Sequence, residues 1–129
     1  MTNVERHLVV VVAVDDDFRV RESIESLVES VGYSPQLFSS AEAFLQSGSL
    51  AVAACVITDV RMPGMDGIEL QRRIRLERPT LPVIFISALD NPTTREIALN
   101  EGAVNFLYKP FKAADLLGKL RAALATVQK

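Results

Sequence analysis

Five short apolar runs alternate with segments of helical periodicity along the chain, and this alternation restricts the fold more than any other feature of the sequence. Strands that are apolar on both faces are typical of a parallel sheet covered by helices on both sides. A regular βα alternation produces such a sheet. The sequence therefore predicts one α/β domain over residues 1–129 with five parallel strands. The apolar runs occupy residues 8–14, 33–38, 53–58, 81–87 and 104–108.

Helix signals fill the intervals between the apolar runs. Apolar residues recur at helical spacing from Val20 to Val31, and Gly32 is suited to end that helix. Ser39 and Glu42 fit a capping box, with Ser39 as the N-cap of a short helix. Three further helices are expected. The first ends at Pro79, the second begins at Asn91 or Thr93 and ends at Gly102, and the third follows Pro110.

Composition narrows the classes of protein to which the chain can belong. A formal net charge of −2 argues against a general nucleic-acid-binding surface, which needs a strongly basic face. The single cysteine, Cys55, lies in an apolar run and is predicted to be a small buried side chain. The run at 8–14 is too short to span a bilayer, which favours a cytoplasmic protein. A solvated helix face is predicted for Arg72, Arg73, Arg75 and Arg78.

Charged and hydroxyl side chains stand where the predicted strands end. The carboxyl ends of parallel strands share one edge of the sheet, where ligands of open α/β folds bind. Carboxylates crowded together there either point apart into water or are offset by a cation, and Mg²⁺ suits oxygen ligands of this kind. A carboxylate can also attack phosphorus, and a lysine can stabilise the charge that develops. The residues at this edge are Asp15, Asp16, Asp17, Asp59, Ser87 and Lys109.

With these residues in place, the chain resembles the receiver domain of two-component response regulators along nearly its whole length. The resemblance rests on VDDD at 14–17, DVRMPGMDG at 59–67, Ser87–Ala88, and KPF at 109–111. It implies a flavodoxin-like fold with strand order 2-1-3-4-5 and helices on both faces.

The resemblance also implies roles for individual residues. Asp59 would be the phosphoacceptor, and Lys109 would bridge to the phosphoryl group. Asp15 and Asp16, together with Asp59 and the backbone carbonyl of Arg61, would hold Mg²⁺. Asp17 follows the same strand, but the N-cap of the next helix is the preferred interpretation of this residue.

A second set of implied roles concerns switching. Ser87 would move to hydrogen-bond the new phosphate near the Ala88 amide, Phe106 would turn inward, and the Lys109–Pro110 bond would be cis. A sensor histidine kinase or phosphotransfer protein would donate the phosphoryl group. The fourth helix, fifth strand and last helix would then change their affinity for an effector domain or protein, and the same face can support a homodimer. Direct binding of nucleic acid or membrane by this domain is not expected.

Three alternatives remain open at this point. An aspartyl-phosphate phosphohydrolase of the haloacid-dehalogenase type would use Asp15 and Asp17, but it would leave Asp59 unused and needs two acids after Lys109, where only Asp115 follows. An interaction module could keep the fold without the chemistry. The chain could also be the receiver half of a longer DNA-binding regulator. The preferred interpretation is a regulatory phosphoacceptor, not an enzyme.

Overall fold

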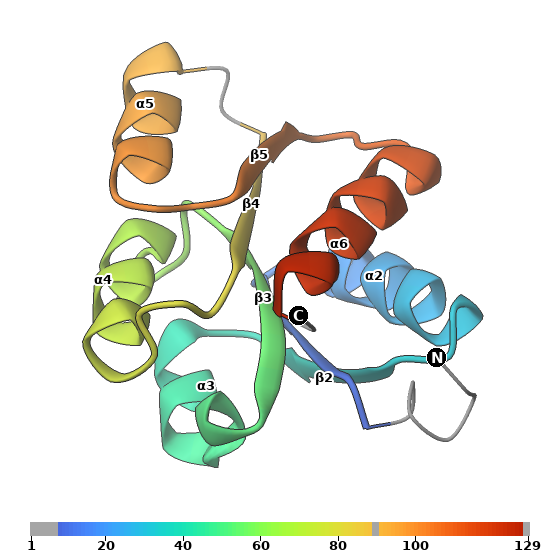
Figure 1. Ribbon diagram of the computed structural model, residues 1–129. Helices are drawn as coiled ribbons and strands as arrows, with labels where there is room; N and C mark the ends of the chain where they lie inside the picture. Colours follow the sequence, from blue (N-terminus) through green and yellow to red (C-terminus); the bar gives the residue numbers. More distant parts are fainter. Residues whose placement is uncertain (1–7, 89–90, 128–129) are drawn as a thin grey trace.

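Five parallel strands form one sheet in the computed structural model, which describes residues 8–88 and 91–127 (Figure 1). The strand order is β2-β1-β3-β4-β5, as the resemblance to receiver domains implies. β2 pairs only with β1 and lies at an edge, where Pro35 need not donate a hydrogen bond to a second neighbour. The strands are β1 (Val10–Val14), β2 (Ser34–Phe38), β3 (Ala53–Asp59), β4 (Val83–Ser87) and β5 (Asn105–Tyr108).

Helices cover both faces of the sheet (Figure 1). α2 (Phe18–Ser30) and α6 (Ala113–Val127) lie on one face. The other face carries α3 (Ala41–Ser47), α4 (Gly67–Glu77) and α5 (Pro92–Asn100), with the short 3₁₀ helix η1 (Ser49–Ala51) after α3. None of the described helices combines the length and apolar character needed to cross a membrane.

The central strands are buried on both faces, which explains their continuous apolar sequence. In β1, Val12 and Val14 pack with the core under α3, α4 and α5, whereas Val11 and Ala13 pack with the core under α2 and α6. Cys55 is fully buried in the second of these cores, as predicted. Because the sheet is packed on both faces, it forms a rigid support for the residues at its edge.

The helix ends follow the sequence signals with one correction. Asp17 caps α2 by accepting a hydrogen bond from the Arg19 amide at 2.9 Å. Asn91 is the N-cap of α5, with Pro92 in the first turn. The predicted capping box at Ser39 and Glu42 is wrong, because Ser40 is the N-cap of α3 and accepts from the Ala43 amide.

Glu42 instead connects α3 to the loop that precedes α4. Its carboxylate accepts a hydrogen bond from the Met65 amide at 3.0 Å, across 23 residues of sequence. This bond lowers the pKa of the Glu42 carboxyl. Gly64, beside it, has a φ of 79°, and a side chain there would meet the same carboxylate. Glu42 thereby ties the loop before α4 to α3.

The arginines of α4 differ in their surroundings, which corrects part of the prediction. Arg72 is exposed and forms a two-point ion pair with Glu101, with oxygen distances of 2.6 and 3.0 Å. Arg78 is not on a solvated face, because its guanidinium donates to the carbonyls of Leu50 and Ala53. A long basic side chain can reach backbone acceptors that lie far away in sequence, and periodicity does not identify such contacts.

Candidate functional site

The sheet register brings the polar strand ends together. Val14 of β1 is opposite Thr58 of β3, so the next residues, Asp15 and Asp59, are neighbours at the sheet edge. On the other side, Ser87 of β4 is opposite Tyr108, and the following Lys109 amide donates to the Ser87 carbonyl at 2.8 Å. Residues far apart in sequence thus meet because parallel strands end at one edge.

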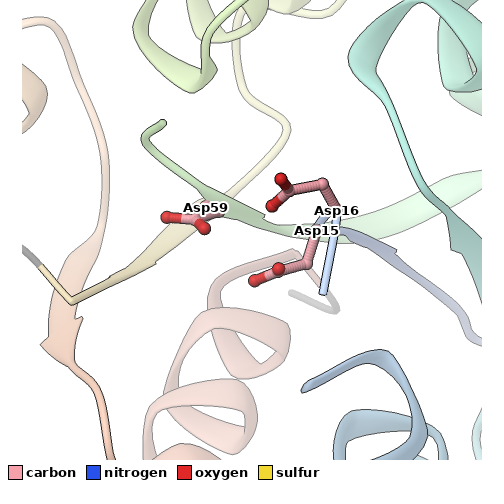
Figure 2. Close-up of side chains that lie close together, drawn as sticks. All are labelled: Asp15, Asp16 and Asp59. Atoms are coloured by element: carbon pink, nitrogen blue, oxygen red, sulfur yellow. The ribbon is translucent and has the colours of Figure 1, made fainter. Parts of the chain in front are cut away.

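Three carboxylates converge at this edge (Figure 2). Asp15, Asp16 and Asp59 each offer an oxygen, and these atoms all lie within 4.8 Å of one another. Asp15 is fully buried and Asp59 is buried, whereas Asp16 is exposed. The cluster therefore has a rigid buried side and an open side facing solvent.

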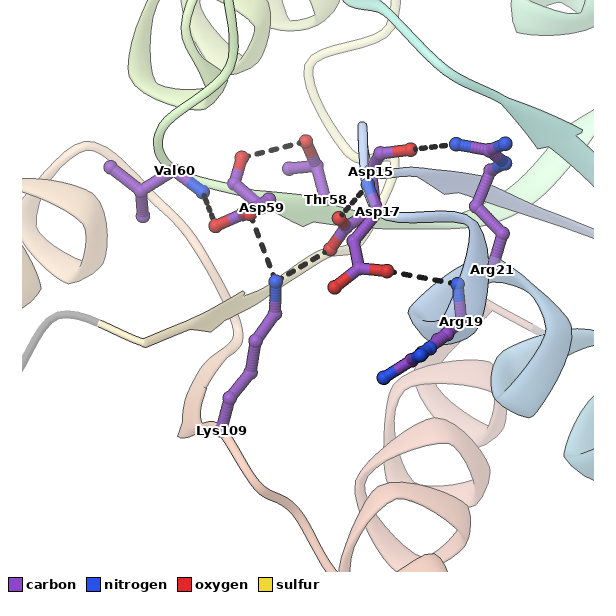
Figure 3. Close-up of polar contacts among 8 residues, drawn as sticks. All are labelled: Asp15, Asp17, Arg19, Arg21, Thr58, Asp59, Val60 and Lys109. Carbon is purple, nitrogen blue, oxygen red and sulfur yellow. Dashed lines mark hydrogen bonds and ion pairs between the residues drawn. The ribbon is translucent and has the colours of Figure 1, made fainter.

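Lys109 is the cation that the chain itself supplies to this cluster (Figure 3). Its Nζ lies 2.9 Å from Asp59 Oδ2, to which it donates a hydrogen bond, and 2.9 Å from Asp15 Oδ2. The second contact is an ion pair, and among the described residues Asp15 Oδ2 has no donor other than this ammonium. One ammonium thus faces three carboxylates, and the cluster keeps an excess of negative charge.

Burial and ion pairing shift the pKa values of this pair. Desolvation raises the pKa of the Asp15 carboxyl, even though Lys109 and the Asp17 amide favour its ionised form. Burial by itself would lower the pKa of the Lys109 ammonium, but its contacts with Asp15 and Asp59 outweigh burial and leave the pKa raised. Ionised Asp15 is therefore costly in this environment, and a further cation would stabilise it.

These residues fit a small divalent cation. Among the described residues, the buried Asp15 Oδ2 has no partner besides the Lys109 ammonium. Three carboxylates lie close together, and all the offered ligands are oxygens, which Mg²⁺ prefers. Arg61, whose carbonyl is a further expected ligand, is exposed in the loop directly after Asp59. In that loop, the Val60 amide donates to Asp59 Oδ1 at 2.7 Å and orients the carboxylate.

The residues expected to take part in switching lie close to the site but in different environments. Ser87 is buried at the end of β4, and the exposed Ala88 follows it. Phe106 is buried opposite Phe85, with ring centroids 5.9 Å apart, two strand positions before the residue opposite Ser87. The Lys109–Pro110 peptide bond is cis.

Sequence patterns did not indicate three of the contacts that shape the site. Arg21 Nη1 donates to the Asp15 carbonyl at 2.7 Å (Figure 3). Thr58 Oγ1 donates to the Asp59 carbonyl at 2.9 Å. Gly67 packs so closely on that carbonyl that a Cβ would collide with it. Only Gly67 gave a signal, as the last glycine of the DVRMPGMDG loop.

An open cavity of about 880 Å³ lies beside the site, between α2 and the segment that follows β5. Its lining includes Val20 and Leu27 of α2, with Ala88, Lys109 and Phe111 on the opposite side. Because Lys109 lines the cavity and also contacts Asp15 and Asp59, the cavity lies next to the carboxylate cluster.

Comparison with known proteins identifies relatives of this architecture. The family model of the response regulator receiver domain matches residues 11–121. The response regulator protein TodT of Pseudomonas putida is 43% identical over 115 residues, which are 89% of this chain and 51% of TodT. The transcriptional regulatory protein FixJ of Bradyrhizobium diazoefficiens is 36% identical over 111 residues, 86% of this chain and 54% of FixJ.

A solved structure agrees with these sequence matches. The chemotaxis protein CheY4 of Vibrio cholerae superposes with a TM-score of 0.83 at 26% identity, covering 90% of this chain and 98% of CheY4. The chain spans about half the length of TodT and FixJ.

Proposed function

Because the chain belongs to the response regulator receiver domain family, we propose that it accepts a phosphoryl group on Asp59 in a Mg²⁺-dependent reaction. The observation that carries the proposal is the convergence of Asp15, Asp16 and Asp59, with the Lys109 ammonium in contact with Asp15 and Asp59. The donor would be a phosphohistidine of a sensor kinase or phosphotransfer protein. The domain would be regulatory and cytoplasmic, would span residues 1–129, and would promote only its own phosphorylation and dephosphorylation.

Each residue of the site would have a distinct role in the reaction. A carboxylate oxygen of Asp59 attacks phosphorus, the P–N bond to the donor imidazole breaks, and the electron pair leaves with the imidazole nitrogen. Lys109 pairs with a phosphoryl oxygen. Asp15, Asp16, Asp59 and the Arg61 carbonyl would hold Mg²⁺, which would supply charge compensation for the transferred group.

Transmission of the signal would follow from the new phosphate. Ser87 and the Ala88 amide would bind it, and the position of buried Phe106 would be coupled to Ser87 as a two-state element. The face built from α5, β5 and α6 would bind the effector or a second copy. Its apolar exposure supports this role: Ile97, Val104 and Tyr108 are 41%, 47% and 36% exposed.

Phosphorylation of Asp59 can be tested by intact mass after incubation with acetyl phosphate and Mg²⁺, and by beryllofluoride binding. We expect one phosphoryl group on the wild type and none on Asp59→Asn. Asp115→Asn is the matched control, since this acid is exposed on α6 outside the cluster. Mg²⁺-dependent modification that persists in Asp59→Asn would defeat the assignment.

The phosphohydrolase alternative makes a different prediction for the same experiment. It would place the phosphoryl group on Asp15, with Asp17 as its partner. The Asp17 carboxylate is engaged as the cap of α2, which counts against that role. Mapping the modified peptide distinguishes the two, because Asp15 follows β1 and Asp59 ends β3, so that they lie far apart in the sequence. An effector domain in the remaining length of a longer regulator is part of the proposal, supported by FixJ, a transcriptional regulatory protein.

A further inference from the structure

We propose that Arg21 is a positioning residue for the Mg²⁺ site: it fixes the peptide group that joins Asp15 to Asp16 and so presents Asp16 to the metal. The inference rests on the proposed function. Its basis is a side-chain contact from α2 to the backbone of the acidic segment, where Arg21 Nη1 donates to the Asp15 carbonyl at 2.7 Å.

Asp15 Oδ2 pairs with the Lys109 ammonium, and the other polar atoms of Asp15 are held by hydrogen bonds. Its amide donates to the Phe38 carbonyl at 3.1 Å, and its Oδ1 accepts from the Asp17 amide at 2.9 Å. Arg21 holds the carbonyl. Figure 3 shows this bond next to the Asp17 contact. Asp15 is thus fixed by its neighbours in β2, at the start of α2 and within α2.

Asp16 has less support of its own. It is exposed, while the other two carboxylates of the cluster are buried. Since a peptide group is planar, fixing the direction of the Asp15 carbonyl also fixes the Asp16 amide and the position of the Asp16 Cα, to which its side chain is attached. Arg21 therefore controls the exposed carboxylate through the preceding peptide.

Arg21 is itself restrained. Its guanidinium lies over the Phe18 ring, 5.7 Å from the centroid, within the range of a cation–π contact. Phe18 is 65% exposed at the first position of α2, so its ring buries little apolar surface and mainly supports the arginine.

Two effects of Arg21 on metal binding have opposite signs, so they can be separated. As a positive charge near the cluster, Arg21 disfavours a second cation, and its removal would tighten Mg²⁺ binding. As a positioning group, it preorganises Asp16, and its removal would weaken binding. Outer groups that orient metal ligands typically change metal affinity by about 10- to 100-fold when they are lost.

The test is a calorimetric Mg²⁺ titration of wild type, Arg21→Met and Arg21→Lys, with thermal unfolding in EDTA to confirm that each variant is folded. We expect Arg21→Met to bind Mg²⁺ about tenfold more weakly. Arg21→Lys, which keeps a donor of similar reach, should recover much of the loss. Arg19→Met is the matched control, because it removes the same charge from the same helix turn without removing the contact to the Asp15 carbonyl.

An unchanged or tighter Mg²⁺ affinity in Arg21→Met would overturn the inference. A wild type that binds no Mg²⁺ would instead contradict the proposed function, so the two failures are distinguishable. If Arg21→Met does not fold, Phe18→Ala is the alternative test. This variant removes the ring under the guanidinium but keeps the charge of Arg21, and Mg²⁺ binding should weaken a few-fold. Wild-type affinity in Phe18→Ala would then count against the inference.

Discussion

Lys109 contributes to the charge balance of the carboxylate cluster through two ion pairs. Without a metal, its ammonium partly neutralises Asp15 and Asp59, and it is the nearest cation to both. Burial raises the pKa of Asp15, which means that ionised Asp15 costs stability at neutral pH. A bound cation would offset this cost, because the three carboxylates of the cluster could hold a metal ion.

We predict that Lys109→Met is destabilising chiefly when Mg²⁺ is absent. Removing one partner of a buried ion pair leaves an uncompensated charge, and the free energy of unfolding should fall by about 3 kcal/mol in EDTA at pH 8. Saturating Mg²⁺ should narrow this deficit because the dication replaces the lost charge. Urea unfolding with and without Mg²⁺ measures both values, with exposed Lys112→Met as control. Equal deficits in the two conditions would show that the metal does not compensate the same carboxylates.

At the scale of elements, α4 connects the carboxylate site to α5. Its first residue, Gly67, donates its amide to the Val60 carbonyl at 2.7 Å and packs on Asp59. One turn later, Gln71 Nε2 donates to the Ala98 carbonyl of α5, and Arg72 pairs with Glu101 at the end of α5. These contacts connect the backbone of Asp59 to α5 through α4, separately from the switch that we propose at Ser87.

Gln71 is expected to limit the stability of this contact. It is fully buried, its hydrogen bond is long at 3.3 Å, and its Oε1 has no donor among the described residues. Gln71→Met should raise the free energy of unfolding by about 1 kcal/mol, because an unsatisfied acceptor is removed at similar volume. The Ala98 carbonyl keeps the Ala103 amide at 3.0 Å.

The control for that substitution is Gln71→Ala, which leaves a cavity and should lower stability by about 2 kcal/mol. Urea unfolding compares the variants. If Gln71→Met is less stable than wild type, the amide is better satisfied in solution than these contacts indicate.

For the whole molecule, Cys55 provides a built-in probe of stability. It lies in the central strand β3 and is fully buried, and burial raises the pKa of its thiol to about 12. The thiolate is the reactive species, so the folded protein should resist thiol reagents near pH 8. Since the sequence contains one cysteine, every labelling event reports on the opening of this strand.

We predict that Mg²⁺ slows the labelling of Cys55 by a disulfide reagent at pH 8. When refolding is faster than labelling, the rate follows the unfolded population, and Mg²⁺ at a hundred times its dissociation constant should reduce that rate about a hundredfold. Asp16→Asn should lose most of the effect, and Asp115→Asn should keep it. A rate that is insensitive to Mg²⁺ in a protein shown to bind it would mean that β3 opens locally, without global unfolding.

The sequence by itself determined the order and type of the elements, the edge position of β2, the cap at Asp17 and the residues at the functional edge. These follow from periodicity, from Pro35 and from the rule that the carboxyl ends of parallel strands share one edge. Each of these signals can be read from a short stretch of sequence. Tertiary structure decided which of two adjacent serines caps α3, which amide Glu42 binds, where Arg78 donates, and that Arg21 holds the Asp15 carbonyl. Each of these depends on where a second segment lies in space, and a local pattern carries no information about that distance.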